Sequence, residues 1–345
     1  MNPRVEKLRA TLEEPLLVTS PVNVFYLSGF KSSNAALLVE PERVRLFADF
    51  RYSDAGRAVA GVEFEETRRD LLGDLGERLS GRTGFEAAAV SYAGYEKLRA
   101  GRVEPVPQYD VVEHLRAVKD DRELEAIRRA CAITDRVFER LVEETFVGRS
   151  ERDLAWRIEQ LFHDEGGEGS AFETHVSSGP NGATPHATLS DRVIERGETV
   201  VVDTGCLVDA YMSDYTRTFA TGPLDGELKE AYELVLTAQQ AGLGAIRAGV
   251  TGFDADAAAR RVIEESRFAG TFGHGLGHGL GLLVHEAPRL SPESSDTLEP
   301  GNVHTVEPGI YLSGRGGIRI EDDVVVTADG LENLTGFRKD LMLVD

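Results

Sequence analysis

Four acidic residues stand within runs of Val, Ile and Thr, where an ionised side chain is least expected. They are Asp203, Asp214, Glu307 and Glu321. Burying an ionised carboxylate costs several kcal/mol unless a cation or hydrogen-bond donors compensate for it. A turn-capping role, as for Asp203 beside Gly205, would explain one such position taken alone. Four of them, with histidines between them, predict a site that binds cations.

The histidines offer nitrogen ligands for the same site. Five of the eight are candidates: His186, His274, His278, His285 and His304. Residues 273–281 read Gly-His-Gly-Leu-Gly-His-Gly-Leu-Gly, and their glycines permit close approach of the backbone to a bound group. A phosphate-binding loop is the alternative, but no buried strand leads directly into this segment and no Lys-Ser/Thr follows it. Imidazoles in this arrangement favour a divalent metal.

The ligand count indicates more than one ion. Four carboxylates and one imidazole are too many for a single catalytic metal, and they fit two ions that share carboxylates. A set so rich in oxygen favours Mn²⁺ or Co²⁺, with Zn²⁺ as a further candidate. Two ions about 3.5 to 4 Å apart activate water and stabilise the charge that develops on the attacked group. The predicted reaction is hydrolysis.

The strands that must position these ligands fall in two blocks. One block holds residues 200–202 and 215–219, and the other holds 303–306 and 318–326. Each block separates two carboxylates by 11 or 14 residues across a turn, and the arms of a hairpin can then bring both side chains onto one face. Helices are expected at 120–141, 150–162, 226–247 and 253–266. This part of the chain is predicted to be α+β.

The first part of the chain follows the pattern of a smaller α/β domain. We expect strands at 35–39 and 44–49, helices at 70–80 and 92–100, and a last strand near 111–112 after a turn at 104–107. A capping box formed by Asp120 and Glu123 then opens a long amphipathic helix. We therefore predict two domains, residues 1–117 and 118–345.

Composition argues against several classes of binding partner and cellular location. The chain has 38 basic and 59 acidic side chains and a net charge of −21, which disfavours nucleic acid and anionic membrane surfaces. Two cysteines, Cys131 and Cys206, suit a reducing compartment. The first residues lack the pattern of a secretory signal, and no apolar run approaches the roughly 18 to 20 residues of a membrane helix. We expect a cytoplasmic protein.

The ligand motifs together resemble those of a known family. The residues Asp203, Asp214, His278, Glu307 and Glu321 lie in Asp-Thr-Gly, Ser-Asp-Tyr-Thr-Arg-Thr, the glycine-histidine segment, Thr-Val-Glu-Pro-Gly and Ile-Arg-Ile-Glu-Asp. In this order they resemble the metal ligands of the pita-bread metallopeptidases. Residues 20–30, 33–39 and 48–52 resemble the creatinase-type N-terminal domain of the Xaa-Pro peptidases. The resemblance implies a pita-bread catalytic domain preceded by a creatinase-type domain.

The resemblance also implies which ligands bridge the two ions and which ligands bind only one of them. Asp214 and Glu321 would bridge two ions, Asp203 would chelate one of them, and His278 and Glu307 would hold the other. Glu307 would also carry a proton to the leaving proline nitrogen. A homodimer is implied as the assembly, and a small Xaa-Pro peptide as the substrate.

Further residues take roles around this centre by the same resemblance. His186 would contact the substrate, and His285 would polarise the scissile carbonyl and stabilise the tetrahedral intermediate. Arg319 would orient a ligand carboxylate, with Tyr311 as a weaker candidate for such support. His274 would lie near the pocket, and a purely structural role is the alternative for it. His304, three residues before Glu307 on an expected strand, should point to the opposite face.

The choice within the family depends on the free carboxylate of a dipeptide. The complete ligand set argues against creatinase-like and chaperone relatives, and the N-terminal domain argues against methionine aminopeptidases. Arg289 matches a carboxylate-contacting arginine of prolidases. It would favour a dipeptide because it can pair with the free carboxylate of the proline. We predict an Xaa-Pro dipeptidase. The alternatives are an Xaa-Pro aminopeptidase that acts on longer peptides, or a non-catalytic peptide-binding module.

Overall fold

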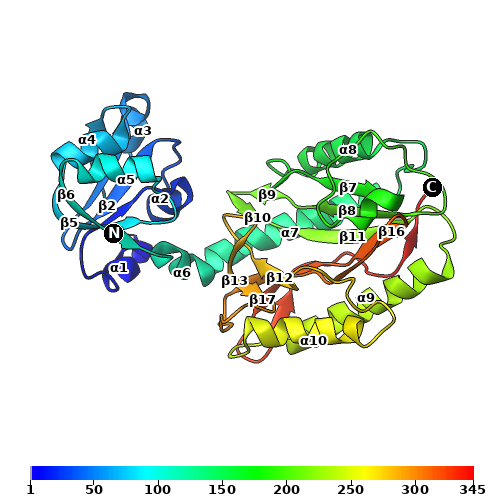
Figure 1. Ribbon diagram of the computed structural model, residues 1–345. Helices are drawn as coiled ribbons and strands as arrows, with labels where there is room; N and C mark the ends of the chain where they lie inside the picture. The colour runs from blue at the N-terminus through cyan, green and yellow to red at the C-terminus, as the bar shows by residue number, and fades with distance from the viewer. Residues whose placement is uncertain (1) are drawn as a thin grey trace. The chain divides into compact units, whose positions relative to one another are not determined.

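The computed structural model describes residues 2–345, which divide into two compact units (Figure 1). The first unit ends at Arg116, and the second spans Ala117–Asp345. Each unit has its own sheets and its own hydrophobic core.

The first unit is a mixed six-stranded sheet with helices. The strand order is β4-β3-β2-β1-β5-β6. The strands are β1 (Leu16–Val18), β2 (Ala35–Val39), β3 (Val44–Asp49), β4 (Glu63–Thr67), β5 (Ser80–Glu86) and β6 (Arg102–Gln108). The helices are α1 (Pro3–Arg9), α2 (Pro21–Ser28), α3 (Ser53–Arg57), α4 (Leu71–Arg78), α5 (Tyr92–Arg99) and α6 (Val111–Ala117), with a 3₁₀ turn η1 (Phe50–Tyr52). Leu17, Leu38 and Phe47 of the sheet pack against Leu75 of α4 and Leu98 of α5.

One expectation for this unit is wrong. Residues 111–112, expected to be a strand, begin α6, and the strand lies earlier, in β6. Pro105 and Pro107 suggested a turn, but both lie within β6. β6 is at the edge of the sheet, where a residue without a backbone N–H leaves no ladder bond broken on its open side.

The second unit contains two larger sheets between two pairs of helices. The sheet orders are β19-β11-β8-β7 and β13-β12-β14-β17-β18, with short pairs β10-β9 and β15-β16. The strands are β7 (His175–Ser178), β8 (Thr199–Thr204), β9 (Leu207–Val208), β10 (Tyr211–Met212), β11 (Tyr215–Ala220), β12 (Gly277–Gly279), β13 (Glu286–Leu290), β14 (Val303–Val306), β15 (Gly309–Leu312), β16 (Gly316–Arg319), β17 (Asp322–Val326), β18 (Leu331–Asn333) and β19 (Met342–Leu343).

The helices of the second unit cover opposite sides of the paired sheets. They are α7 (Asp121–Leu141), α8 (Glu151–Asp164), α9 (Gly226–Ala245) and α10 (Gly252–Glu264), with a 3₁₀ turn η2 (Gly179–Ala183). Figure 1 shows α8 beside β7 and β8, while α9 and α10 lie on the far side, against β16 and β13. The sheets are thus held between two layers of helices, and the predicted α+β class is confirmed.

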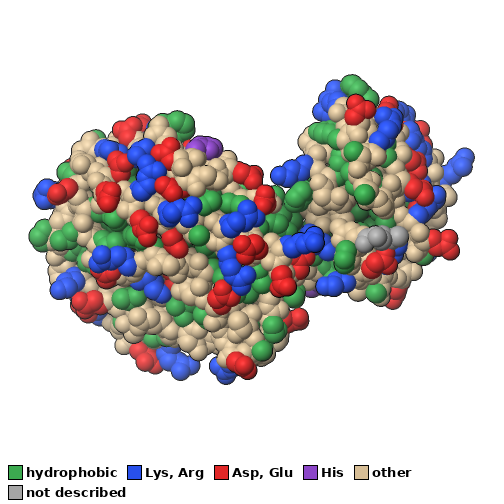
Figure 2. Space-filling model, turned by 180° about the vertical axis from the view of Figure 1, so that it is seen from behind, with side chains coloured by type: hydrophobic (Ala, Val, Ile, Leu, Met, Phe, Trp, Pro, Cys, Tyr) green, Lys and Arg blue, Asp and Glu red, His purple; other side chains and the backbone are tan. Residues whose placement is uncertain are grey.

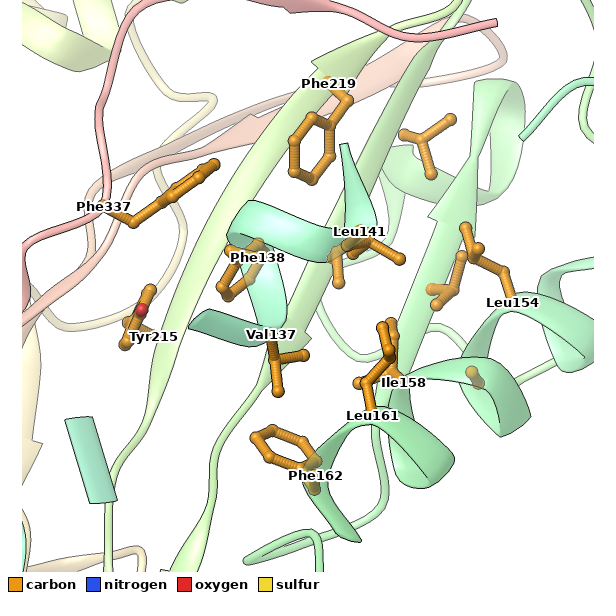
Figure 3. Packing of buried hydrophobic residues seen from close by; sticks show 14 of the residues in the cluster. Val137, Phe138, Leu141, Leu154, Ile158, Leu161, Phe162, Tyr215, Phe219 and Phe337 are labelled. Carbon is orange, nitrogen blue, oxygen red and sulfur yellow. The ribbon is translucent and has the colours of Figure 1, made fainter. Parts of the chain in front are cut away.

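The helix α7 illustrates how local sequence and packing agree. Asp120 and Glu123 form the expected capping box, which satisfies backbone N–H groups at the helix start. Apolar residues then recur at every third or fourth position, and Phe138 inserts among the rings of Tyr215, Phe219 and Phe337 at centroid distances of 5.1, 6.1 and 5.3 Å (Figure 3). This contact fixes β11 against the helix.

The surface carries charges of both signs. Figure 2 shows basic and acidic side chains interleaved over the visible face of the larger unit. Among residues 2–345, no helix combines the length and the apolar character needed to cross a bilayer.

Candidate metal centre

A cavity of about 610 Å³ in the second unit contains the residues singled out in the sequence. Its walls include all five expected metal ligands, Asp203, Asp214, His278, Glu307 and Glu321. They also include His186, His274, His285, Arg289 and Arg319. The tertiary structure therefore brings these residues together from segments up to 135 residues apart in the chain.

Each ligand position lies in a strand or directly at a strand end. Asp203 is in β8, Asp214 immediately precedes β11, His278 is in β12, Glu307 follows β14, and Glu321 lies between β16 and β17. β8 pairs with β11 and β14 pairs with β17, both antiparallel. The two expected hairpin-like blocks are present, and the ligands lie where the two sheets face each other across the cavity.

The side chains converge on a small volume. Ligand atoms of Asp214, His278 and Glu321 all lie within 4.8 Å of one another. The Nε2 atom of His278 is 3.6 Å from Asp214 Oδ2 and 3.4 Å from Glu307 Oε1. Asp203 Oδ1 is buried and makes no hydrogen bond within the described residues. A buried oxygen in this state is an atom that a bound cation would satisfy.

Electrostatics in the cavity disfavour four ionised carboxylates without a cation. Burial, followed by repulsion from neighbouring carboxylates, raises the pKa of Asp214 and of Glu321 well above the ordinary range. Burial likewise raises the pKa of Glu307 to about 8. Burial lowers the pKa of His278 to about 4, so its imidazole is neutral and its lone pair is available. The donor set therefore fits divalent metal ions.

A hydrogen-bonded row holds the ligand carboxylates in place. Arg319 pairs with Asp203 Oδ2 and donates from Nε to Thr216 Oγ1 at 2.9 Å. Thr216 Oγ1 in turn donates to Glu321 Oε2 at 2.6 Å. One guanidinium thus contacts one ligand directly and supports a second through a hydroxyl. The orienting role expected of Arg319 would act through these two contacts.

Tyr311 and His274 continue this row. Arg319 Nη1 donates to the Tyr311 hydroxyl at 3.2 Å, and that hydroxyl lies 2.9 Å from His274 Nε2. His274 Nδ1 lies 2.8 Å from the Gly275 carbonyl oxygen. Because a carbonyl only accepts, Nδ1 carries the proton and Nε2 accepts from Tyr311. Burial lowers the pKa of His274 to about 4, so this tautomer stays neutral.

Three groups with basic character line the mouth of the cavity. His186, His285 and Arg289 are exposed and line the same cavity as the carboxylates. The rings of His278 and His285 meet edge to face at 4.3 Å. Partial burial, and then repulsion from His186 and Arg289, lowers the pKa of His285. The mouth can therefore receive an anionic or carbonyl group of a ligand.

His304 does not line the cavity. It lies in β14 and is fully buried, and its ring nitrogens make no hydrogen bond within the part of the chain that the structure describes. Burial lowers its pKa to about 3. His304 is thus a neutral residue of the interior.

Several supporting residues were not identified from the sequence. Asp323 is fully buried, and its Oδ2 accepts from the Asp214 backbone N–H at 2.9 Å and from the Cys131 thiol at 3.4 Å. Arg217 and Asp322 form an ion pair at 2.8 Å with both side chains fully buried. Their positions beside the ligand motifs were the only available sign, because their partners lie more than 100 residues away.

The cavity also contains side chains that sequence reasoning missed. Phe172, His175, Ser291 and Glu293 line it. His175 was overlooked because it stands alone in its segment, and only the pairing of β7 with β8 brings it to the site.

Comparison with known proteins agrees with this geometry. The profile of metallopeptidase family M24 matches residues 125–328, and that of the creatinase/prolidase N-terminal domain matches residues 4–118. The chain is 34% identical to the Xaa-Pro dipeptidase of Pyrococcus horikoshii over 351 residues, which is 99% of each chain.

Solved structures extend the comparison. An Xaa-Pro dipeptidase from Bacillus anthracis is 35% identical, with a TM-score of 0.95 over 99% of both chains. An X-Pro aminopeptidase from Thermotoga maritima is also 35% identical, with a TM-score of 0.88 over 99% of this chain and 100% of the other.

Proposed function

This chain belongs to metallopeptidase family M24, and we propose that it hydrolyses the peptide bond before proline in Xaa-Pro dipeptides. The observation that carries the proposal is a buried cluster of four carboxylates and one neutral imidazole in a cavity whose mouth bears an arginine. The similarity to Xaa-Pro dipeptidases over nearly the whole chain supports it. The expected pita-bread family is thereby confirmed.

The metal would be held by the converging ligands. Asp203, Asp214, His278, Glu307 and Glu321 have the oxygen-rich donor set of a two-ion site. When bound, two divalent ions would supply Lewis acidity to the scissile carbonyl and lower the pKa of water. We propose Asp214 and Glu321 as the shared ligands, because ligand atoms of both carboxylates and of His278 all lie within 4.8 Å of one another.

Side chains of the protein would transfer the protons and stabilise the negative charge that develops during hydrolysis. Glu307 accepts a hydrogen bond from Thr305 Oγ1 at 3.3 Å, which orients its carboxylate at the cavity wall. It would take a proton from the attacking water and return it to the leaving proline nitrogen. His285 would donate a hydrogen bond to the carbonyl oxygen as negative charge develops there. His186 would contact the substrate at the mouth.

Arg289 would favour dipeptides over longer peptides. It lies in β13 directly opposite His278 in β12, and its backbone N–H donates to Asp296 Oδ2 at 3.1 Å. A bidentate arginine–carboxylate pair contributes about 1.5 to 3 kcal/mol. A dipeptide offers the free proline carboxylate for this pair, whereas a longer peptide continues as an amide.

The deciding experiment compares Ala-Pro and Met-Pro with Ala-Pro-Ala after loading with Mn²⁺, Co²⁺ or Zn²⁺. We expect the dipeptides to be hydrolysed with the higher kcat/KM and chelators to abolish turnover. Equal or faster cleavage of the tripeptide would instead support an Xaa-Pro aminopeptidase, the second candidate favoured by the Thermotoga maritima similarity. Absence of both metal and turnover would indicate a non-catalytic module.

We also propose two Mn²⁺ ions per chain, a homodimer and a cytoplasmic location. The oxygen-rich ligands support manganese, and Cys131 and Cys206, both buried and unpaired, suit a reducing compartment. Elemental analysis of the purified protein and light scattering test the metal and the assembly.

A further inference from the structure

His175 is a cavity residue that the proposed chemistry leaves without a role. It is half-buried and begins β7, the edge strand of the sheet β19-β11-β8-β7. Its side chain lines the same cavity as the carboxylates.

Strand pairing places this imidazole beside a ligand carboxylate. His175 is directly opposite Asp203 in the antiparallel pair of β7 and β8, and Asp203 is opposite Thr216 in β11. Directly opposed residues project to the same face of a sheet with Cβ atoms about 4.5 to 5.5 Å apart. The three side chains therefore form one row across the inner face, with His175 at its outer end.

The second sheet carries a matching arrangement. There, His278 is directly opposite Arg289 of β13, which is also an edge strand. Each sheet thus has a ligand in an inner strand and a nitrogen-bearing side chain beside it on the edge strand. If Arg289 takes the proline carboxylate and the scissile bond lies over the carboxylates, the first residue of the dipeptide extends toward β7. This step rests on the proposed function.

The hydrogen bonding of His175 decides what it offers to a substrate. Its Nδ1 lies 3.3 Å from the carbonyl oxygen of Ala187. A carbonyl oxygen can only accept, so Nδ1 carries the proton and Nε2 is the ring nitrogen left to accept from a ligand. We propose that His175 is a specificity-determining residue that selects Xaa side chains bearing a hydroxyl or amide donor, with Phe172 supplying an apolar neighbour in the same cavity.

The test uses Thr-Pro and Val-Pro, which have nearly the same shape and differ by a hydroxyl. For the Mn²⁺-loaded wild type we expect kcat/KM to be about tenfold higher for Thr-Pro, the ratio given by one hydrogen bond of about 1.4 kcal/mol. His175→Leu should bring the ratio near one, chiefly by lowering kcat/KM for Thr-Pro. His175→Gln retains an acceptor and should keep part of the preference.

A matched control is His163→Leu, which removes an exposed histidine of α8 and should leave the ratio at the wild-type value. A wild-type ratio near one, or an unchanged ratio in His175→Leu, would overturn the role of His175 while leaving the dipeptidase intact. Failure of the metal-loaded wild type to hydrolyse either dipeptide would overturn the proposed function and, with it, this inference. Thermal melting and metal content of each variant establish that the fold and the centre are retained.

Discussion

Asp214 and Glu321 combine deep burial with close neighbours of the same charge. Both are nearly inaccessible to solvent, and burial is the largest cause of their raised pKa. Among the described residues, Arg319 is the cation that contacts this group of carboxylates, and it pairs with Asp203. One guanidinium cannot balance four acidic side chains, so the site depends on cations from outside the chain.

The first prediction concerns these shared ligands. Asp214→Ala or Glu321→Ala removes a carboxylate that both ions would use, so each variant should lose both metal equivalents and reduce kcat by at least about 1,000-fold. Elemental analysis and the Ala-Pro assay measure this. Asp191→Ala, which removes an exposed carboxylate paired with Arg152, is the control. Full metal stoichiometry in either ligand variant would contradict the bridging role.

The second prediction concerns Arg289. Arg289→Ala should raise KM for Ala-Pro by about 10- to 100-fold with a smaller change in kcat, because the lost contact is to a group remote from the scissile bond. The same substitution should leave turnover of the amide Ala-Pro-NH₂ unchanged. Equal losses on the acid and the amide would show that Arg289 acts on the fold and not on the carboxylate.

The third prediction concerns His304. Its pKa of about 3 lies below the ordinary 6.5, so the folded state resists protonation and the unfolded state accepts it. The contribution of His304 to the free energy of unfolding is therefore fully present above pH 6.5. It is lost as the pH falls toward 3, by about 1.4 kcal/mol per pH unit. At pH 7 the free energy of unfolding of His304→Leu should equal that of the wild type or exceed it by about 1 kcal/mol. At pH 5 the advantage of the variant should be larger by about 2 kcal/mol.

Urea unfolding at the two pH values measures this difference. The exposed His163, whose ring lies 3.3 Å from Glu159 Oε1, offers the comparison, since His163→Leu should gain no stability over the wild type on acidification. A His304→Leu variant whose advantage does not grow on acidification would show that His304 is protonated in the folded protein.

At the scale of elements, the glycine-histidine segment is held by α10. Asp256 of α10 accepts from the Leu276 backbone N–H at 2.9 Å and pairs with Arg260 at 2.7 Å. Arg260 donates to the carbonyls of Phe272 at 2.8 Å and His274 at 2.6 Å. The helix thus orients the backbone on which His278 stands, at a distance from the cavity itself.

The fourth prediction tests this support. Asp256→Ala removes the carboxylate that pairs with Arg260 and leaves a buried N–H without its acceptor, so it should destabilise the protein by about 3 kcal/mol and weaken metal binding at least tenfold. Arg261→Ala, an exposed neighbour on the same helix, should change neither quantity. A destabilised variant with wild-type metal affinity would confine Asp256 to a structural role.

Close backbone contacts between strands also limit the residues at the site. A Cβ atom on Gly277 would come within 2.0 Å of the Thr305 carbonyl oxygen. β12 can therefore approach β14 only with glycine at this position, and this approach brings His278 beside Glu307. At Gly277, strand packing and not the approach of a bound group explains the glycine.

At the scale of the whole molecule, we expect metal binding and folding to be coupled in the second unit. Its two hydrophobic cores lie around Phe138 and around Val306, and the carboxylates occupy the cavity between the sheets. The first unit has a separate core. Removal of metal should therefore affect the second unit first.

The fifth prediction follows from the sign of the Glu307 shift. Its pKa of about 8 exceeds the ordinary 4.5, so in the metal-free protein its contribution to stability is present below pH 4.5 and is lost as the pH rises through 8. The Tm of the second unit in EDTA should fall between pH 6.5 and pH 8.5, and Glu307→Gln should weaken this fall.

Addition of Mn²⁺ at pH 8.5 should restore the Tm of the wild type, with about 2.7 kcal/mol of stabilisation at 100 times Kd. Scanning calorimetry measures both effects. The transition of the first unit serves as an internal control, because it contains none of the ligands. A metal-free Tm that rises across this pH range would contradict the account of the carboxylate cluster.

The sequence by itself determined the elements and the ligand motifs. Strand and helix periodicity predicted β2, β3, α4, α5 and the four helices of the second unit, because the buried faces of these elements repeat at 2 or 3.6 residues. The carboxylates were recognisable because charge within an apolar strand needs a compensating partner. Both signals are local, so they can be read without knowing which strands pair.

Only the tertiary structure decided which distant residues meet. His175 lies beside Asp203 through the register of β7 and β8, and Asp323 supports Asp214 across 109 residues of chain. β6 tolerates Pro105 and Pro107 because it is an edge strand, a property that no short segment carries. Register and edge position depend on the packing of the whole sheet, so a local pattern cannot specify them.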